Sequence, residues 1–361
     1  MLWYCLIPAI FYFLLIRQIY SFLKSVKPVD FSNSPDIQVS VIVPCKNEEG
    51  NLPFILKDLG MQDYNPDLFE VLVIDDNSSD NTFQVASLYK GIRNYSCVKS
   101  LDRGKKGAIF RAAEISTGEL IITTDADCRM GPGWISAHAS VYSRYNPDLI
   151  IGPVQLEEGS GFTGKFQELE FLSLQGITAG TAQEGKPVMC NGANLSFKKT
   201  SFLRHSLNLI NEIQSGDDVF LLHSLKRDPS ARIRLLNTQE GLVTTKQCNT
   251  LFSFIRQRAR WISKAGKYRD AFTINIAIIT FATVLSLIFL LIAGMFIPEL
   301  LYVFLIALVV KSIADFLLLK EVTSRYNKKH LLRWFLPSQA VYPFYVMVVA
   351  IASLFTGEKW K

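Results

Sequence analysis

The chain has 361 residues, of which 49% are apolar and only 19% are charged, and its formal net charge is +6. Because soluble globular domains carry about 25% charged residues, this composition excludes a disordered chain and argues against an ordinary soluble globule. The apolar excess is concentrated in residues 1–23 and 271–356. The mild positive charge suits a protein beside an anionic membrane or one that handles phosphorylated substrates, and it gives no support to nucleic-acid binding.

Four apolar segments are each long enough to cross a bilayer as a helix, which takes about 20 residues. The first, residues 2–23, has no basic stretch before it and no small-residue cleavage site after it. We therefore expect an uncleaved anchor and not a signal peptide. The other three segments are residues 271–293, 297–319 and 335–356.

Lysines and arginines gather in the short segments that flank these spans. They are Lys24, Lys27, Lys264, Lys267, Arg269, Lys320, Arg325, Lys328, Lys329 and Arg333. This asymmetry predicts an outside N-terminus and a cytoplasmic segment 24–270, in a multi-pass protein of a bacterial-type inner or plasma membrane. The six cysteines form no CxxC pair, which predicts reduced thiols and fits the same compartment.

One span carries two charges of opposite sign. Lys311 and Asp315 are four residues apart, so they share one face of the expected helix. This spacing favours a self-neutralising pair that faces the interior of the bundle, and a role in lining a lipid or glycan path is the alternative.

Between the first two spans, short β-rich runs alternate with helical patterns. Strands are expected at residues 38–44, 69–74 and 120–124, and helices at residues 51–60, 81–90 and 105–116. Alternation of this kind, with strands that are apolar throughout, predicts an α/β fold with a mostly parallel sheet covered on both faces. In such sheets ligands bind beyond the carboxyl ends of the strands.

Two of these strand ends carry paired carboxylates. Asp75 and Asp76 follow one strand, and Asp125 and Asp127 follow another. Carboxylates gathered in one cleft repel each other unless a cation compensates them, and a hard divalent cation is the natural compensator. Such a cation would bring a substrate diphosphate with it. The chain has no GxxxxGK[ST] or GxGxxG sequence, so a nucleotide site here would rely on acids and metal.

Seven short motifs occur in the order typical of one enzyme family. They are VSVIVPCKNEEGNL (39–52), VLVIDDNSSDNT (71–82), RGKKGA (103–108), TTDADC (123–128), CNGAN (190–194), SGDDVFL (215–221) and QRARW (257–261). The chain resembles the inverting GT-A-fold glycosyltransferases of family 2, in the membrane-bound branch near the polysaccharide synthases and ceramide glucosyltransferases. One departure is that the E-D motif of the family reads Asp217-Asp218 here.

The resemblance implies a domain organisation. Residues 1–24 would be a transmembrane anchor, residues 36–268 a cytoplasmic GT-A (Rossmann-like) domain that ends in an interfacial helix, and residues 271–356 three transmembrane helices. The implied reaction moves a sugar, with inversion, from a nucleotide-sugar to a hydroxyl of a lipid or glycan acceptor. The donor in this family is most often a UDP-sugar.

The resemblance also assigns roles to residues. Asp127, with Asp125 beside it, would hold Mg²⁺ or Mn²⁺ and offset the charge of the leaving diphosphate. Asp218 would be the general base. The further substrate-binding residues would be Asp75 and Asp76 for uracil or ribose, then Lys105, Asn191, Gly192, Asn194, Asp217, Gln257, Arg260 and Trp261.

Within the last motif, Arg260 would stabilise phosphate charge and Trp261 would stack on the acceptor. The spacing of this motif alone also fits a plain amphipathic helix at the membrane surface, and Arg258 is expected to be an ordinary residue on it.

Two alternatives to a single transfer stay open. One is a processive polysaccharide synthase, although such enzymes usually have more membrane helices than the four expected here. The other is a non-enzymatic membrane binding protein with a decayed transferase fold, which the intact Asp127 and Asp218 argue against.

Overall fold

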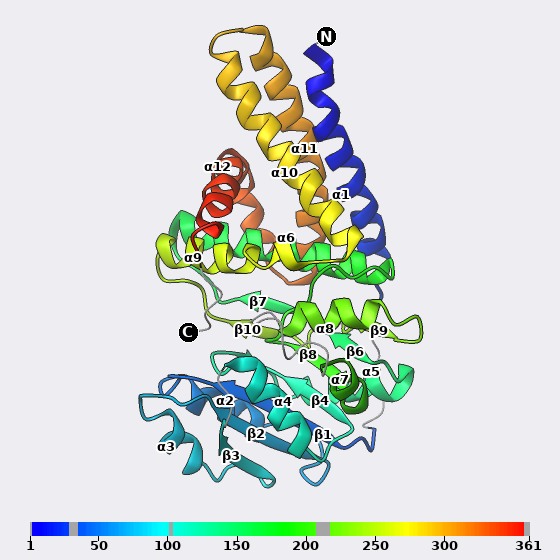
Figure 1. Ribbon diagram of the computed structural model, residues 1–361, viewed down its shortest axis with the longest axis vertical. Coiled ribbons are helices and arrows are strands. Elements are labelled where there is room, and N and C mark those ends of the chain that lie inside the picture. Colours follow the sequence, from blue (N-terminus) through cyan, green and yellow to red (C-terminus); the bar gives the residue numbers. More distant parts are fainter. Residues whose placement is uncertain (1, 29–34, 101–103, 207–216, 357–361) are drawn as a thin grey trace. The chain divides into compact units, whose positions relative to one another are not determined.

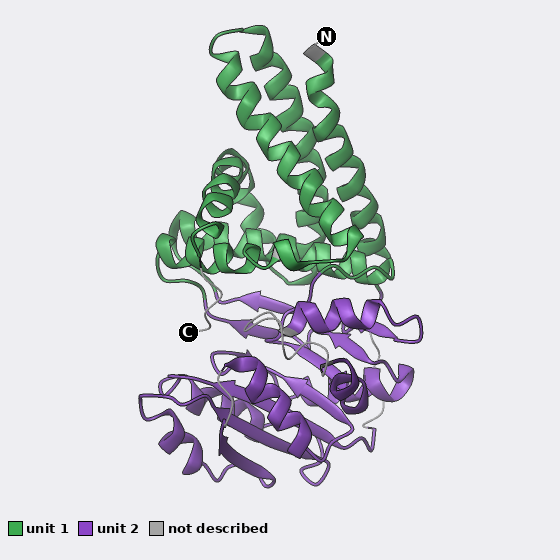
Figure 2. Ribbon diagram, in the orientation of Figure 1, with its two compact units in different colours: residues 1–26, 158–188, 247–357 green, residues 27–157, 189–246, 358–361 purple. Residues whose placement is uncertain are grey.

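The computed structural model describes residues 2–28, 35–100, 104–206 and 217–356 (Figure 1). The chain divides into two compact units, and each is described by itself below (Figure 2). Unit 1 comprises Met1–Val26, Glu158–Val188 and Gln247–Gly357, and unit 2 comprises Lys27–Glu157, Met189–Lys246 and Glu358–Lys361.

Unit 2 contains the α/β fold that the sequence predicts. Over its described residues it is built on a seven-stranded sheet of order β3-β2-β1-β4-β8-β6-β9. Its strands are β1 (Val39–Cys45), β2 (Phe69–Asp75), β3 (Tyr95–Lys99), β4 (Leu120–Thr123), β6 (Leu149–Ile151), β8 (Leu195–Lys198) and β9 (Ile233–Leu235). Strand β8 is antiparallel to both of its neighbours, and the other pairings are parallel.

The central strands are buried along their whole length. Every residue of β1 and β4 is buried, as is all of β2 except Glu70, which is half-buried. Continuous apolar runs of this kind are typical of strands with both faces covered. In the register of the sheet, Cys45 lies opposite Asp75 and Ile42 lies opposite Thr123. The carboxyl ends of β1, β2 and β4 therefore meet at one edge of the sheet.

The helices of unit 2 connect these strands. They are α2 (Leu52–Gly60), α3 (Thr82–Ser87), α4 (Lys105–Ile115), α5 (Trp134–Tyr145), α7 (Lys199–Ser206) and α8 (Asp217–Lys226). The predicted strands and helices of the first half are thus confirmed within a few residues. The sequence did not predict the small second sheet, in which β5 (Arg129–Met130), β10 (Val243–Thr245) and β7 (Val154–Leu156) pair in that order.

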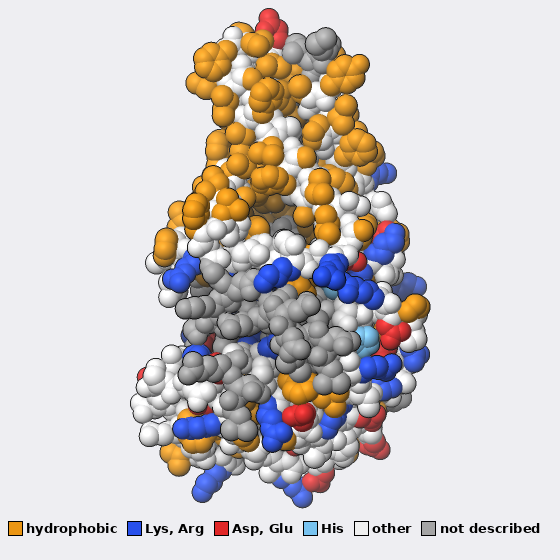
Figure 3. Space-filling model, viewed as in Figure 1, with side chains coloured by type: hydrophobic (Ala, Val, Ile, Leu, Met, Phe, Trp, Pro, Cys, Tyr) orange, Lys and Arg blue, Asp and Glu red, His pale blue; other side chains and the backbone are white. Residues whose placement is uncertain are grey.

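Unit 1 contains the predicted apolar helices. Of the described residues, four helices are long and apolar enough to cross a membrane: Trp3–Ser25, Ala271–Gly294, Glu299–Arg325 and Lys329–Ser353. They contain α1 (Ile7–Ser25), α10 (Ala271–Gly294), α11 (Glu299–Arg325), and η3 (Lys329–Trp334) with α12 (Phe335–Ser353). Hydrophobic side chains cover much of the surface of these helices in the face shown in Figure 3.

Two helices that lie within residues 36–268, the expected catalytic domain, belong to unit 1. They are α6 (Gly161–Gln183) and α9 (Leu251–Ile262). Helix α6 packs against α1 and α11, and α9 packs against α12. The structure therefore does not keep residues 36–268 together as one compact domain, because residues 158–188 and 247–268 pack with the apolar helices.

Glycines explain how α6 comes so close to its neighbours. A Cβ atom added at Gly176 would lie 2.5 Å from Cγ2 of Val322 on α11. A Cβ atom added at Gly180 would lie 2.6 Å from both Cγ2 and the carbonyl oxygen of Ile19 on α1. Real side chains do not tolerate such distances, so these positions require glycine for the helices to pack at this spacing.

The two charges in α11 form a buried cluster in unit 1. Lys311 is fully buried, and its Nζ lies 2.5 Å from Oδ2 of Asp315 and 2.9 Å from Oε1 of Gln339 on α12. The Tyr12 hydroxyl on α1 donates to the other oxygen of Asp315 at 2.6 Å. The expected pair inside the bundle is confirmed, and it also connects α1, α11 and α12.

This cluster predicts an unequal effect of single and double substitutions. Lys311→Met leaves the Asp315 carboxylate without its cation, and we expect it to cost about 3–5 kcal/mol of stability. Lys311→Met combined with Asp315→Leu removes both charges and should cost less than the single change. Thermal unfolding in detergent measures both. A double variant at least as unstable as the single one would contradict this account of the pair.

Candidate active site at the carboxyl edge of the sheet

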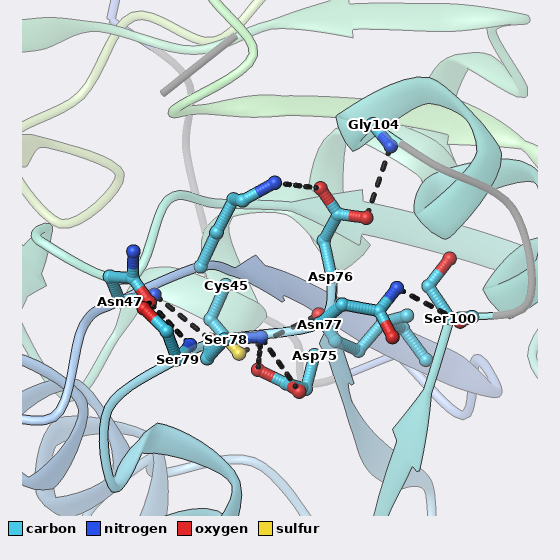
Figure 4. A network of polar contacts seen from close by, with 11 residues as sticks. Cys45, Asn47, Asp75, Asp76, Asn77, Ser78, Ser79, Ser100 and Gly104 are labelled. Atoms are coloured by element: carbon cyan, nitrogen blue, oxygen red, sulfur yellow. Dashed lines mark hydrogen bonds and ion pairs between the residues drawn. The ribbon is translucent and has the colours of Figure 1, made fainter.

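Asp76 joins the turns that follow β1 and β2 to the start of α4. Its side chain is only 1% exposed. One carboxylate oxygen lies 3.1 Å from Nζ of Lys46, and the other accepts the backbone N–H of Gly104 at 3.0 Å (Figure 4). Asp75 is equally buried, and it accepts the backbone N–H of Ser78 at 3.3 Å. Both carboxylates are buried beneath the surface of this edge and hold its turns in place. Their predicted contact with uracil or ribose stays a prediction.

Asp125 and Asp127 lie just beyond the end of β4. Both side chains are partly exposed. Nζ of Lys105, in the first turn of α4, forms an ion pair with Oδ1 of Asp125. Burial, reinforced by these two carboxylates, raises the pKa of the Cys128 thiol well above its ordinary value, so that thiol stays protonated.

The two aspartates fit a hard divalent cation by their chemistry, since both offer carboxylate oxygens beside open surface. Across the described residues, no group of three or more His, Cys, Asp or Glu side chains could hold a metal ion. A cation on Asp125 and Asp127 would therefore complete its shell with oxygens from water or from a bound diphosphate.

Asp218 stands in the first turn of α8. Its Oδ2 accepts the backbone N–H of Gly192 at 2.9 Å, and its Oδ1 accepts that of Val219 at 2.9 Å. The carboxylate is thus held against the loop that precedes β8. The side chain of Asp217, and residues Arg103, Ser215 and Gly216 of the predicted motifs, lie outside the described part of the chain.

Gly192 lies next to both Lys105 and Asp218. A Cβ atom at this position would lie 3.4 Å from Nζ of Lys105 and 3.6 Å from Oδ2 of Asp218. The structure therefore brings Lys105, Asp125 and Asp218 together around a residue that has no side chain of its own. The ammonium group of Lys105 and the carboxylate of Asp218 therefore both lie beside Gly192.

Asn191 and Asn194 form hydrogen bonds within the loop that precedes β8. The side-chain oxygen of Asn191 accepts the N–H of Ala193 at 3.0 Å, and its carbonyl accepts the N–H of Asn194 at 3.0 Å. Thr123 on β4 donates its hydroxyl to the carbonyl of Gly192 at 3.2 Å. These bonds hold the loop in the shape that presents the Gly192 N–H to Asp218.

The structure corrects the prediction that Asn194 contacts substrate, because the side chain of Asn194 is buried. Its side chain is fully buried, and its amide donates to the carbonyls of Pro153 at 2.7 Å and Gly241 at 2.8 Å. Its oxygen accepts from Nε1 of Trp134 and from Nε2 of His138, each at 2.9 Å. All of its hydrogen-bonding positions are taken, so Asn194 supports the loop from behind.

Sequence reasoning missed Trp134 and His138. The signal was their spacing of four residues, which places both on one face of α5. Burial lowers the pKa of His138 to about 4, against a smaller opposing effect of its hydrogen bond with Asn194. The ring is therefore neutral at pH 7, with Nε2 protonated toward Asn194 and Nδ1 accepting from Ser196 at 2.8 Å.

The last motif lies on α9 in unit 1. Gln257, Arg260 and Trp261 are half-buried there. The helix begins with a capping box, in which the hydroxyl of Thr250 accepts the N–H of Ser253 at 3.1 Å. Arg258 is buried and ion-paired with Glu170, which corrects the expectation that it is an ordinary residue of an interfacial helix.

Residues 40–204 match the model of the family Glycosyl transferase family 2. This span runs from β1 into α7 and includes Asp76, Asp125, Asp127 and Gly192. The chain therefore carries a glycosyl transferase family 2 domain.

Sequence relatives match parts of the chain. Glycosyltransferase AglE of Haloferax volcanii is 28% identical over 139 residues, which are 38% of this chain and 46% of the relative. Human dolichyl-phosphate beta-glucosyltransferase is 38% identical over 107 residues, which are 26% of this chain and 32% of the relative. These matches thus span less than half of each relative's own length.

A solved structure matches almost the whole chain. It is the mannosyltransferase PcManGT from Pyrobaculum calidifontis, in complex with GDP-Man and Mn²⁺. The TM-score is 0.58, the sequence identity is 20%, and the match covers 98% of this chain and 99% of that one. At this identity the likeness establishes a common fold, the GT-A fold.

The buried histidine predicts a loss of stability in acid. The folded-state pKa of His138 is about 4, below the ordinary value of 6.5. The stability that the neutral, buried ring contributes to the fold is therefore fully present above pH 6.5 and is lost as pH falls toward 4. The linkage between protonation and folding puts the full loss of unfolding free energy at about 3 kcal/mol. We expect His138→Gln to flatten the fall in unfolding temperature between pH 6.5 and 4. Equal slopes for this variant, the exposed control His330→Gln and the wild type would contradict it.

Proposed function

We propose that the chain is a membrane-bound glycosyltransferase that moves a sugar from a nucleotide-sugar to a hydroxyl of a lipid or glycan acceptor, with inversion. The observation that carries this proposal is the convergence of Lys105, Asp125 and Asp218 around Gly192. It provides charge for a leaving diphosphate and a base for an attacking hydroxyl within one site.

At the donor end, Asp125 and Asp127 would hold Mg²⁺ or Mn²⁺. Such an ion supplies positive charge that stabilises the leaving diphosphate. Lys105, next to Asp125, adds a second positive charge to the same place. The complex of PcManGT with GDP-Man and Mn²⁺ supports a nucleotide-sugar and a divalent cation for a chain of this fold. We propose a UDP-sugar as the donor, in line with the family pattern.

At the acceptor end, Asp218 would take the proton of the acceptor hydroxyl as the oxygen attacks the sugar. The N–H groups of Gly192 and Val219 each hold one carboxylate oxygen, so the direction of the base is set before the acceptor arrives. One base and no enzyme nucleophile give a single displacement, and a single displacement inverts the anomeric centre.

A lipid acceptor is favoured by the unit that contains the last motif. Gln257, Arg260 and Trp261 belong to the same unit as the four apolar helices. A beta-monoglucosyldiacylglycerol synthase of Nostoc is 30% identical over 126 residues, which are 33% of this chain and 26% of that protein. The human relative is named for dolichyl-phosphate. We propose that the apolar helices span the membrane and that the catalytic residues lie on its cytoplasmic side, where nucleotide-sugars are made.

Asp218→Asn tests the base. The amide keeps the size of the side chain but cannot take a proton, so transfer should fall about 10²–10⁴-fold while UDP affinity stays within a few-fold. Asp217→Asn is the matched control and should be milder. If both residues only cap α8, Asp218→Asn would hardly matter, because asparagine caps as well as aspartate. Near-normal transfer by Asp218→Asn beside an inactive Asp217→Asn would overturn the assignment.

Asp127→Ala tests the metal site. We expect loss of nucleotide-sugar turnover that added Mn²⁺ does not restore, together with weaker Mn²⁺ binding in a titration followed by electron paramagnetic resonance. The exposed Asp67→Ala is the control, since its partner is Arg93 at the surface. Full activity of the wild type in EDTA would rule out the metal role.

A further inference from the structure

One buried arginine stands out on the helix that carries the last motif. Arg258 is 4% exposed, whereas Arg256 on the same helix is exposed. A guanidinium is costly to bury unless its charge is paired and its N–H groups are bonded. The contacts of Arg258 in unit 1 show what compensates it.

The partner of Arg258 is Glu170 on α6. Its Nη2 lies 2.7 Å from Oε2 of Glu170, and its Nε lies 3.0 Å from Oε1, so the pair is bidentate. The hydroxyl of Tyr345 on α12 also donates to Oε1, at 3.0 Å. A single carboxylate therefore binds α9 and α12 to α6. Bidentate pairs of this kind fix orientation as well as contributing energy.

The rest of the guanidinium contacts two residues of the motif. Its Nη1 donates to Oε1 of Gln257. Its central carbon lies 4.2 Å from the ring centroid of Trp261 and 4.8 Å from that of Phe254. Arg258 thus holds a hydrogen bond to Gln257 and a stacking contact with Trp261 while Glu170 fixes its own position.

We propose that Arg258 and Glu170 are a positioning pair that sets the orientation of Gln257 and Trp261. For its effect on transfer, this inference rests on the proposed function, with Trp261 stacking on the acceptor as the family resemblance implies. Lysine cannot replace Arg258, because an ammonium group has neither the planar fork that matches Glu170 nor the flat face that stacks on Trp261.

The pair also makes the motif depend on a candidate membrane-spanning helix. Tyr345 lies on α12, and its ring stacks on Phe254 of α9 with a centroid distance of 5.3 Å. Through Glu170, the same tyrosine reaches the carboxylate that holds Arg258. The orientation of Gln257 and Trp261 is therefore tied to the packing of α12.

The test compares Arg258→Lys with Arg256→Lys, a charge-conserving control at an exposed position of the same helix. Acrylamide quenching reports the exposure of Trp261, whose emission is obtained by difference from Trp261→Phe. We expect increased quenching of Trp261 in Arg258→Lys and no change in the control. Glu170→Gln should shift quenching in the same direction by a smaller amount, because it keeps the shape of the carboxylate but loses its charge.

Turnover supplies a second readout. UDP release from a UDP-sugar without acceptor reports the donor end, and transfer to a membrane lipid extract reports both ends. We expect Arg258→Lys to lower transfer about tenfold, as loss of a desolvated stacking contact implies, with UDP release unchanged. A loss of folding would not give this split, because it would lower both activities and the unfolding temperature together. A direct contact of Arg258 with the acceptor is excluded by its burial.

Two results would overturn the positioning pair. One is Trp261 quenching and transfer in Arg258→Lys that equal those of Arg256→Lys. The other is a parallel fall of UDP release, transfer and unfolding temperature in both Arg258→Lys and Glu170→Gln. If the wild type turns over no nucleotide-sugar, the proposed function fails, and the quenching comparison still decides whether the pair orients Trp261.

Discussion

The parallel register of β1, β2 and β4 is the constraint on which the candidate site depends. Parallel strands in register end at the same edge, and the pairing of Cys45 with Asp75 and of Ile42 with Thr123 sets that edge here. Segments far apart in the chain then leave the sheet side by side. The acids that follow β2 and β4 lie at the same edge for this reason, although they are about 50 residues apart in the sequence.

Each unit also contains buried charges, and these are compensated differently in the two units. In unit 2, Asp76 is buried against Lys46 and a backbone N–H, so its charge ties two turns together. In unit 1, Lys311 and Arg258 are buried inside helical packing, each with a carboxylate partner. A buried charge demands a specific partner at a specific place, and each pair therefore fixes the mutual orientation of the elements that carry it.

The family 2 domain and the apolar helices meet different physical requirements within one chain. In the domain, Asp125 and Asp127 are partly exposed at the sheet edge, as the proposed binding of a diphosphate and a cation requires. The apolar helices need close packing and few unpaired polar groups, and Gly176 and Gly180 permit that packing for α6. The last motif, on α9, therefore belongs to the same compact unit as the apolar helices.

The sequence by itself determined the positions of β1, β2 and β4, the acids that follow β2 and β4, and the apolar helices. These features depend on local pattern, because periodicity and composition act over neighbouring residues. Only the tertiary structure decided that Asn194 is buried, that Arg258 turns toward Glu170, and that α6 packs with the apolar helices. Each of these outcomes depends on contacts between residues distant in the chain, such as Arg258 and Glu170. The pattern of neighbouring residues does not indicate which distant residue will be the partner.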